Sequence, residues 1–274
     1  MIFFSGCSAP SKMPEFDKNS VPILLSVNAL FKKRGLRYAL RRSPLSIKGD
    51  WLLDSGAFTR ISRLYGFKNH LPVKKYAKII RQFTQYGHCL GAVSQDYMCE
   101  SFILEVTGLD ISTHQKLTIH RYDRLLSELG NPPVPIIPVL QGYDPKDYVH
   151  HIAKYGQRLT EGMWVGVGSV CKRNSNPESV RQVLVAIKSE RPDLRLHGFG
   201  LKLSCLRLSG IRDLLYSADS AAADLWSKPG DRKTRKYQNA NSVQHVIDYR
   251  NQLKTVQLEF PFMSDCVYQK GGDG

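Results

Sequence analysis

The stretch VPIIPVLQGYDPKDYVHHIAKYG, residues 134 to 156, joins the two patterns that decide the fold. Residues 134–142 form a short apolar run rich in β-branched side chains, which is typical of a buried strand. Asp144 and Pro145 then supply a helix cap and a proline for the first helical position, and a segment of helical period follows. The stretch therefore predicts one βα unit.

The same unit recurs along the chain. Further apolar runs lie at residues 21–27, 51–58, 89–96, 163–169, 194–200 and 214–220, and further helical segments at 72–87, 112–130 and 176–190. Continuous apolar strands separated by helices predict a parallel sheet that is covered on both faces.

Seven or eight such units without a long linker favour a single-domain α/β fold, the TIM-type (β/α)₈ barrel. We expect one domain over residues 1–274, with its core at about 20–260 and a closing amphipathic helix within 239–260. An open doubly wound sheet is the alternative. The absence of a Gly-x-Gly-x-x-Gly turn after the first strands weakens a dinucleotide-binding interpretation of that alternative.

The charge of the chain points to a polyanionic partner. Among its 274 residues, 39 Lys and Arg stand against 24 Asp and Glu, a formal net charge of +15. Residues 32–49 hold seven basic residues and no acid, and residues 228–237 hold five basic residues and one acid. Such clusters favour binding to phosphates, since their neutralisation releases counterions, although a solvated basic surface is the simpler alternative.

The six cysteines are scattered without a CxxC pair, which is typical of reduced thiols rather than of a disulfide framework. No apolar run approaches the roughly 20 residues that a membrane helix needs. The first residues also lack the pattern of a signal peptide. We therefore expect a cytoplasmic protein that has no membrane partner.

Polar residues and glycines gather where the predicted strands end. In a parallel barrel all these carboxyl ends open onto one face, which is where the active sites of such enzymes lie. Each residue alone could be a helix cap or a turn former, but the recurrence predicts a shared substrate pocket. The residues at these ends are Asp54, Ser55, Gly56, Asp96, Gln141, Gly142, Gly168, Gly200 and Asp219.

Such a pocket suits a purine-like base. Carboxylates accept hydrogen bonds from the N1–H and amine of guanine, and an amide or a backbone N–H can donate to its O6. Phe58 could stack on the ring, a contact worth roughly 1–3 kcal/mol, or could belong to the core.

Two other chemistries fit the sequence less well. A metal site needs clustered ligands, but the adjacent His150 and His151 point to different parts of a helix surface. Cys171 could act as a nucleophile, yet the sequence places no histidine to activate it.

The ordered set LLDSGAFT, SQD, PVLQG, VGVGS, HGFG and SADS, each at the end of a successive strand, resembles the tRNA-guanine transglycosylase superfamily. The resemblance is greatest to its DNA-acting branch, the 7-deazaguanine DNA transglycosylases (DpdA) of bacteria and phages, and covers residues 20 to 240. It implies a (β/α)₈ barrel that exchanges guanine in DNA for a free 7-deazaguanine base such as preQ0.

The resemblance also implies residue roles. Asp219 would be the nucleophile that forms a covalent glycosyl-enzyme, and Asp54 the acid/base group. Asp96 would bind the N1 and amine edge, Gln141 and the Gly168 backbone would bind O6, and Phe58 would stack. The basic residues that follow Asp219 would hold the flanking phosphates; they are Lys228, Arg232, Lys233, Arg235 and Lys236.

The chain also departs from the superfamily. It has Ala57 and Thr59 where the tRNA enzymes usually have Gly and Gln, and it lacks the CxCxxC spacing of their structural zinc. We therefore expect no metal and no cofactor. Its short length favours DNA over tRNA; a transglycosylase acting on tRNA and a catalytically inactive barrel that binds nucleic acid remain alternatives.

Overall fold

The computed structural model describes residues 1–34, 37–63, 70–221 and 243–255. Within them a parallel sheet has the strand order β7-β6-β5-β2-β1-β11-β10-β9-β8. The strands are β1 Ile2–Cys7, β2 Ile23–Ser26, β5 Asp50–Asp54, β6 His88–Val93, β7 Ile136–Ile137, β8 Val139–Leu140, β9 Trp164–Val167, β10 Arg195–Gly198 and β11 Ser217–Ser220.

The sheet closes on itself at Pro138. The two end strands, β7 and β8, are consecutive in the chain and are separated only by this proline, which has no N–H to give to a sheet. On one side of it β7 pairs with β6, and on the other side β8 pairs with β9. The Pro138 carbonyl accepts a hydrogen bond from Gly166 N at 2.8 Å. Because the run 136–140 acts as one interrupted strand, the described strands form an eight-membered parallel barrel.

The predicted TIM-type barrel is therefore confirmed, and the open doubly wound sheet is wrong. All seven predicted apolar runs contain a strand, but β1 was missed. It lies between β2 and β11 and pairs with both. The expected core boundary at about residue 20 is consequently wrong, because the barrel already includes Ile2.

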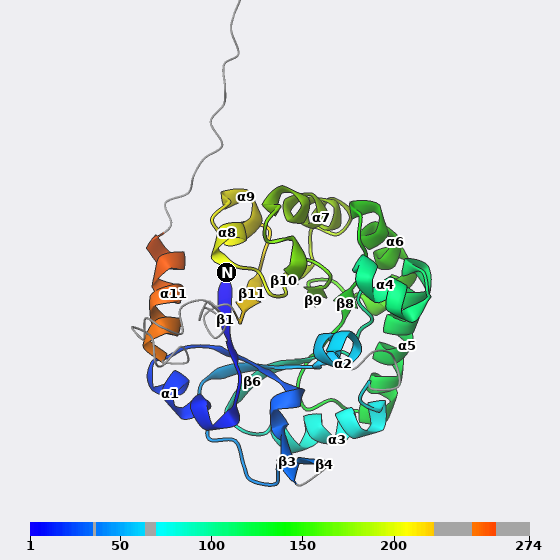
Figure 1. Ribbon diagram of the computed structural model, residues 1–274. Helices are drawn as coiled ribbons and strands as arrows, with labels where there is room; N and C mark the ends of the chain where they lie inside the picture. Colours follow the sequence, from blue (N-terminus) through cyan, green and yellow to red (C-terminus); the bar gives the residue numbers. More distant parts are fainter. Residues whose placement is uncertain (35–36, 64–69, 222–242, 256–274) are drawn as a thin grey trace, which may run out of the picture.

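Helices surround the strands, most of them in an outer ring, with α2 drawn inside that ring (Figure 1). They are α1 Met13–Lys18, α2 Ala57–Arg63, α3 Val73–Phe83, α4 Ser101–Thr107, α5 Ile111–Leu129, α6 Pro145–Tyr155, α7 Pro177–Glu190, α8 Leu203–Leu206, α9 Ser209–Arg212 and α11 Val243–Thr255. Four of them, α3, α5, α6 and α7, match the predicted helical segments, and α11 lies within the predicted closing helix. None of the helices in the described ranges is long and apolar enough to cross a membrane.

The basic segment 32–49 begins with a hairpin. After β2 the chain makes the short helix η2 Val27–Leu30 and then the antiparallel strands β3 Phe31–Arg34 and β4 Arg37–Leu40. The cations of Arg60 and Lys75 lie over the ring of Phe31, at 5.3 and 5.1 Å from its centroid. The hairpin is thus anchored beside α2 and α3.

Apolar side chains divide between the inside and the outside of the barrel, as the alternation of a strand requires. The larger cluster packs the strands against the surrounding helices. The smaller cluster fills the barrel with Phe4, Leu52, Val93, Ile137 and Val139.

Because side chains alternate along a strand, the residue two positions after an inward-facing side chain also points inward. At the carboxyl ends of the strands these inward positions are polar rather than apolar: they are Ser26, Asp54, Gln141 and Asp219.

Candidate active site

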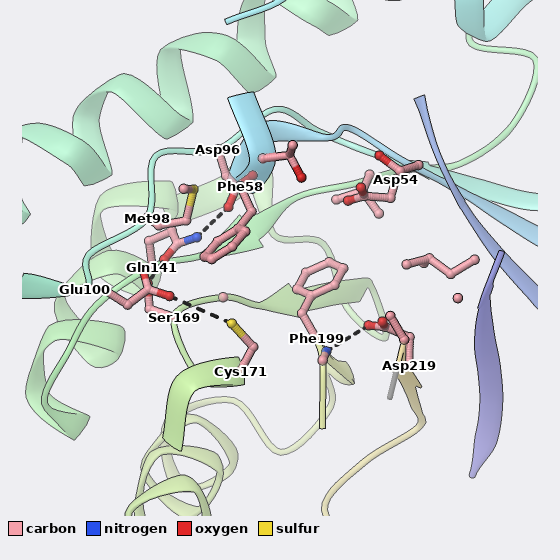
Figure 2. A pocket seen from close by; sticks show the side chains of 18 of the residues that line it. Asp54, Phe58, Asp96, Met98, Glu100, Gln141, Ser169, Cys171, Phe199 and Asp219 are labelled. Carbon is pink, nitrogen blue, oxygen red and sulfur yellow. Dashed lines mark hydrogen bonds between the residues drawn. The ribbon is translucent and has the colours of Figure 1, made fainter. Parts of the chain in front are cut away.

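A cavity of about 420 Å³ opens at the carboxyl ends of the barrel strands. Figure 2 shows Asp54 and Asp219 at one end of it, called here the Asp219 end, and Asp96, Gln141 and Glu100 at the other, called the Gln141 end. The rings of Phe58 and Phe199 point into the space between the two ends (Figure 2).

Most of the predicted pocket residues meet in this cavity. Its walls include Asp54, Phe58, Asp96, Gln141, Gly168, Gly200 and Asp219. These residues are distant in sequence. They meet because a closed parallel sheet brings the carboxyl ends of all its strands to one face.

Three predicted residues, Ser55, Gly56 and Gly142, are not among the residues that line the cavity. The buried Ser55 accepts the N–H of Ala57 in the turn that starts α2. Gly56 has φ +69°, and a Cβ there would clash with the amide of Asn28. A Cβ at Gly142 would lie 2.6 Å from Cβ of Asp147. These residues shape the turns that present their neighbours.

Asp219 is buried, with 6% of its surface exposed, and its hydrogen bonds from described residues converge on one oxygen. The N–H of Gly200 donates to Oδ1 at 3.0 Å, and Nε2 of His197 lies 3.3 Å from the same atom. Gly200 has φ +63°, a conformation that favours glycine, which is how its N–H reaches back to β11. Within the described residues, Asp219 therefore accepts hydrogen bonds from β10 and from the turn after it.

Asp54 lies on β5 at the same end of the cavity. Its Oδ2 accepts the N–H of Gly56 at 3.0 Å. Burial raises the pKa of Asp54 to about 6, and the charge of Asp219 raises that pKa further against the opposing effects of its hydrogen bonds. A carboxyl group with such a pKa can give and take a proton near neutral pH.

Asp96 and Gln141 form a pair at the other end. Nε2 of Gln141 donates a short hydrogen bond to Oδ2 of Asp96. Burial raises the pKa of Asp96 to about 7, with the charge of Asp54 as the next cause. The backbone N–H of Gln141 donates to Nδ1 of His151 at 2.8 Å, so Nε2 of His151 carries the proton and donates to the Gln115 carbonyl. His151 is therefore a buried support for Gln141 rather than a metal ligand.

Gly168 lies against this pair, but its backbone is already engaged. Its N–H donates to the Leu140 carbonyl at 2.9 Å, and its carbonyl accepts from the hydroxyl of Tyr148 at 2.8 Å. The predicted donation from Gly168 N–H to a base oxygen is therefore not supported. A Cβ at this position would clash with the amide of Gln141, so Gly168 instead provides room for that side chain.

Glu100 was not predicted, and Ser169 links it to Gln141. Oγ of Ser169 lies 2.7 Å from Oε1 of Gln141 and 2.9 Å from Oε2 of Glu100. Ser169 has one hydroxyl proton, which it can donate to only one of these two acceptors at a time. Burial raises the pKa of Glu100, against the lowering effect of the hydrogen bond from Ser169.

Cys171 is a poor candidate for a nucleophile. Its Sγ lies 3.9 Å from Oε1 of Glu100, and burial raises the pKa of the thiol to about 12. A thiol with this pKa stays protonated at neutral pH and has little nucleophilicity. In the described ranges no group of three His, Cys, Asp or Glu side chains has the arrangement of a metal site.

The cavity also contains residues for which the sequence analysis gave no role, among them Ser26, Met98, Glu100, Ser169 and Phe199. The strand period could have identified two of them as cavity residues, because Ser26 and Phe199 each lie two residues beyond an inward-facing position of their strand. Met98, Glu100 and Ser169 lie in loops, where no period indicates which way a side chain points.

The proposed phosphate-binding residues Lys228, Arg232, Lys233, Arg235 and Lys236 lie outside the described residues. A described cation does lie against one ring of the cavity wall: Nζ of Lys172 is 5.5 Å from the centroid of the Phe58 ring.

The arrangement of the cavity suits a planar heterocycle that carries a sugar. Two carboxyl groups lie at one end, hydrogen-bond acceptors and donors lie at the other end, and aromatic rings lie between them. A comparison with curated proteins gives no match. A family model described as DpdA, DeoxyPurine in DNA protein A, matches residues 3–256. Because that match spans well over half of the chain, the protein belongs to the DpdA family and is a transglycosylase-type enzyme of DNA modification.

Proposed function

We propose that the protein replaces guanine in DNA with a 7-deazaguanine such as preQ0, by two displacements at C1′ with Asp219 as the nucleophile. The observation that carries this proposal is that the two ends of the cavity hold different groups. Asp219 and Asp54 occupy one end, and the Asp96–Gln141 pair occupies the other. A nucleotide with its sugar at the Asp219 end would present its base edge to Asp96 and Gln141.

The Gln141 end supports guanine over adenine. The oxygens of Asp96 can accept from the N1–H and the amine of guanine, and the second amide proton of Gln141 can donate to O6. Adenine presents an unprotonated N1 at this edge, so Asp96 would face an acceptor. A 7-deazaguanine has the same N1, amine and O6 edge, so one pocket can hold both the leaving and the entering base.

In the first displacement, a bond forms between an Asp219 oxygen and C1′ while the bond from C1′ to N9 breaks. The electron pair leaves with guanine, and the Asp54 carboxyl group gives that base a proton. In the second, the entering base gives its N9 proton to the Asp54 carboxylate, N9 attacks C1′, and Asp219 departs. The exchange is balanced in protons and leaves the backbone intact.

The target nucleotide must leave its stack to reach the cavity, which costs a few kcal/mol in a duplex. Stacking against Phe58 and Phe199 would offset part of that cost, since each base–aromatic contact is worth roughly 1–3 kcal/mol. We also propose that the exchange needs no metal or other cofactor, because two carboxyl groups supply both the nucleophile and the proton transfer.

The test uses a DNA oligonucleotide labelled in its guanine, with preQ0 as the entering base. The wild-type protein should release labelled guanine, incorporate the deazaguanine and form a protein–DNA adduct that survives denaturation. Asp219→Asn should lose all three activities, whereas Asp213→Asn, an exposed carboxyl near the start of β11, should retain them. Normal exchange by Asp219→Asn, or a preference for RNA of the same sequence, would overturn the proposal.

A further inference from the structure

His197 is a buried histidine that the proposed exchange does not yet use. It lies on β10 with 1% of its surface exposed, in register with Ser217 on β11. Two residues further along β11, Asp219 projects to the same side, because side chains alternate along a strand. The pairing of β10 with β11 therefore places the imidazole beneath the Asp219 carboxylate.

Hydrogen-bond partners fix the tautomer of His197. Nε1 of Trp164, which can only donate, lies 2.9 Å from Oγ of Ser217. The same Oγ lies 2.9 Å from Nδ1 of His197. With the hydroxyl oxygen accepting from Trp164, its own proton points to Nδ1. The proton of a neutral imidazole then lies on Nε2, which faces Oδ1 of Asp219 at 3.3 Å.

Asp219 thus receives two donors on the same oxygen. Nε2–H of His197 and N–H of Gly200 both point to Oδ1. Among the described residues, none donates a hydrogen bond to Oδ2, so the two carboxylate oxygens are not equivalent. The imidazole itself is held by ring contacts, with centroids 4.6 Å from Phe199 and 6.1 Å from Phe4.

We propose that His197 is a positioning residue for the nucleophile: together with Gly200 it holds Oδ1 of Asp219, so that Oδ2 is the oxygen that attacks C1′. This inference rests on the proposed function, because it assigns roles to the two oxygens of the same carboxylate.

The two donors have a second consequence. When Oδ2 bonds to C1′, Oδ1 becomes the carbonyl oxygen of an ester. When the entering base displaces Asp219, negative charge returns to Oδ1, where the N–H groups of His197 and Gly200 stabilise it. His197 should therefore assist the departure of Asp219 more than its attack, and loss of this donor should slow the second displacement more than the first.

Three substitutions separate this role from simple packing. His197→Gln can place an amide N–H near the position of Nε2. His197→Asn has an amide that matches only the Nδ1 side, so it can contact Ser217 but not Asp219. His197→Leu fills the space with no donor. Measurements of thermal unfolding would establish that each variant is folded, and the comparison of Gln with Asn holds even if the Leu variant does not fold.

The readouts are single-turnover guanine release, preQ0 incorporation and the fraction of protein in the DNA adduct. We expect Asn and Leu to slow incorporation roughly 10- to 100-fold, the range for loss of a hydrogen bond to a charged group, and to accumulate adduct. His197→Gln should recover most of the rate. Equal rates for the Asn and Gln variants, or incorporation by the Leu variant at the wild-type rate, would overturn the role of His197.

Failure of the proposed function would look different. In that case the wild-type protein would form no adduct, and Asp219→Asn would still exchange base, whatever the His197 variants do. A wild-type adduct without accumulation in the His197→Asn and His197→Leu variants would reject only the further inference.

Discussion

Asp54 and Asp96 are both buried carboxyl groups with raised pKa values, of about 6 and about 7. Their neighbours separate their roles. Asp54 lies at the Asp219 end, where the leaving base of the proposed exchange would need a proton, whereas Asp96 is hydrogen-bonded to Gln141 at the opposite end. The same perturbation therefore supports proton transfer by one residue and base recognition by the other.

The pH dependence of guanine release should report Asp54. Its folded pKa lies above the ordinary value, so the protonated acid is abundant below pH 6 and falls about tenfold per pH unit above it. Single-turnover release without an entering base should decline with a midpoint near that pH. Asp54→Asn should lower the rate of guanine release roughly 10²–10⁴-fold and should abolish this pH dependence.

Asp50→Asn is the matched control, since Asp50 lies at the amino end of the same strand and pairs with His88. Its release profile should overlay that of the wild type. A flat wild-type profile between pH 5 and 8 would remove Asp54 from the acid role.

Asp96→Asn should stabilise the empty protein at high pH. A raised folded pKa means that the folded state holds the proton more tightly than the unfolded state, so stability falls as pH rises from about 4 to about 7. The shift of about three pKa units corresponds to at most about 4 kcal/mol, and water in the cavity reduces that figure.

Denaturant unfolding at pH 4 and pH 8 checks this prediction. The neutral amide should give a gain over the wild type at pH 8 that vanishes at pH 4. An equal change at both pH values would show that the substitution acts through packing instead.

At the scale of elements, the turns that follow the strands carry the site. The turn after β5 presents Asp54 and leads into α2 with Phe58, and the turn after β10 brings Gly200 N–H to Asp219. The sequence shows such turns through their glycines, but similar glycines have different tasks. The N–H of Gly200 donates a hydrogen bond to Asp219, whereas the missing side chain of Gly142 leaves room for Asp147 of α6.

The segment after β11 should contribute most of the salt-dependent DNA affinity if its basic residues bind phosphates. Substitution of Arg232, Lys233 and Arg235 by Ala should weaken binding and reduce the slope of log affinity against log salt by about 2 to 3, since each phosphate contact contributes about 0.7 to 0.9. Fluorescence anisotropy between low and moderate salt would measure it.

A variant with Lys74, Lys78 and Lys116 replaced by Ala is the control. It removes the same charge from exposed positions on α3 and α5. If both triple variants shift the slope equally, the effect is one of net charge, and the segment after β11 is not part of the interface.

At the scale of the whole molecule, closure of the barrel depends on two features that the sequence showed poorly. β1 has only six residues at the very start of the chain, and its apolar run was too short to be recognised as a strand. Pro138 interrupts an apolar run that pairs with β6 before the proline and with β9 after it. Only the spatial order of β6, β7, β8 and β9 shows that the sheet closes despite this interruption.

The sequence by itself determined the barrel, the face on which the site lies, and most of its carboxyl groups. Periodic apolar runs and capped helices are local patterns, and a parallel barrel sends every strand end to one face. Only the tertiary structure decided which neighbours act on Asp219. The contact between His197 and Asp219, the bridge from Glu100 through Ser169 to Gln141, and the occupied N–H of Gly168 all depend on register and loop path. Those are set by packing between segments far apart in the chain, which no local pattern encodes.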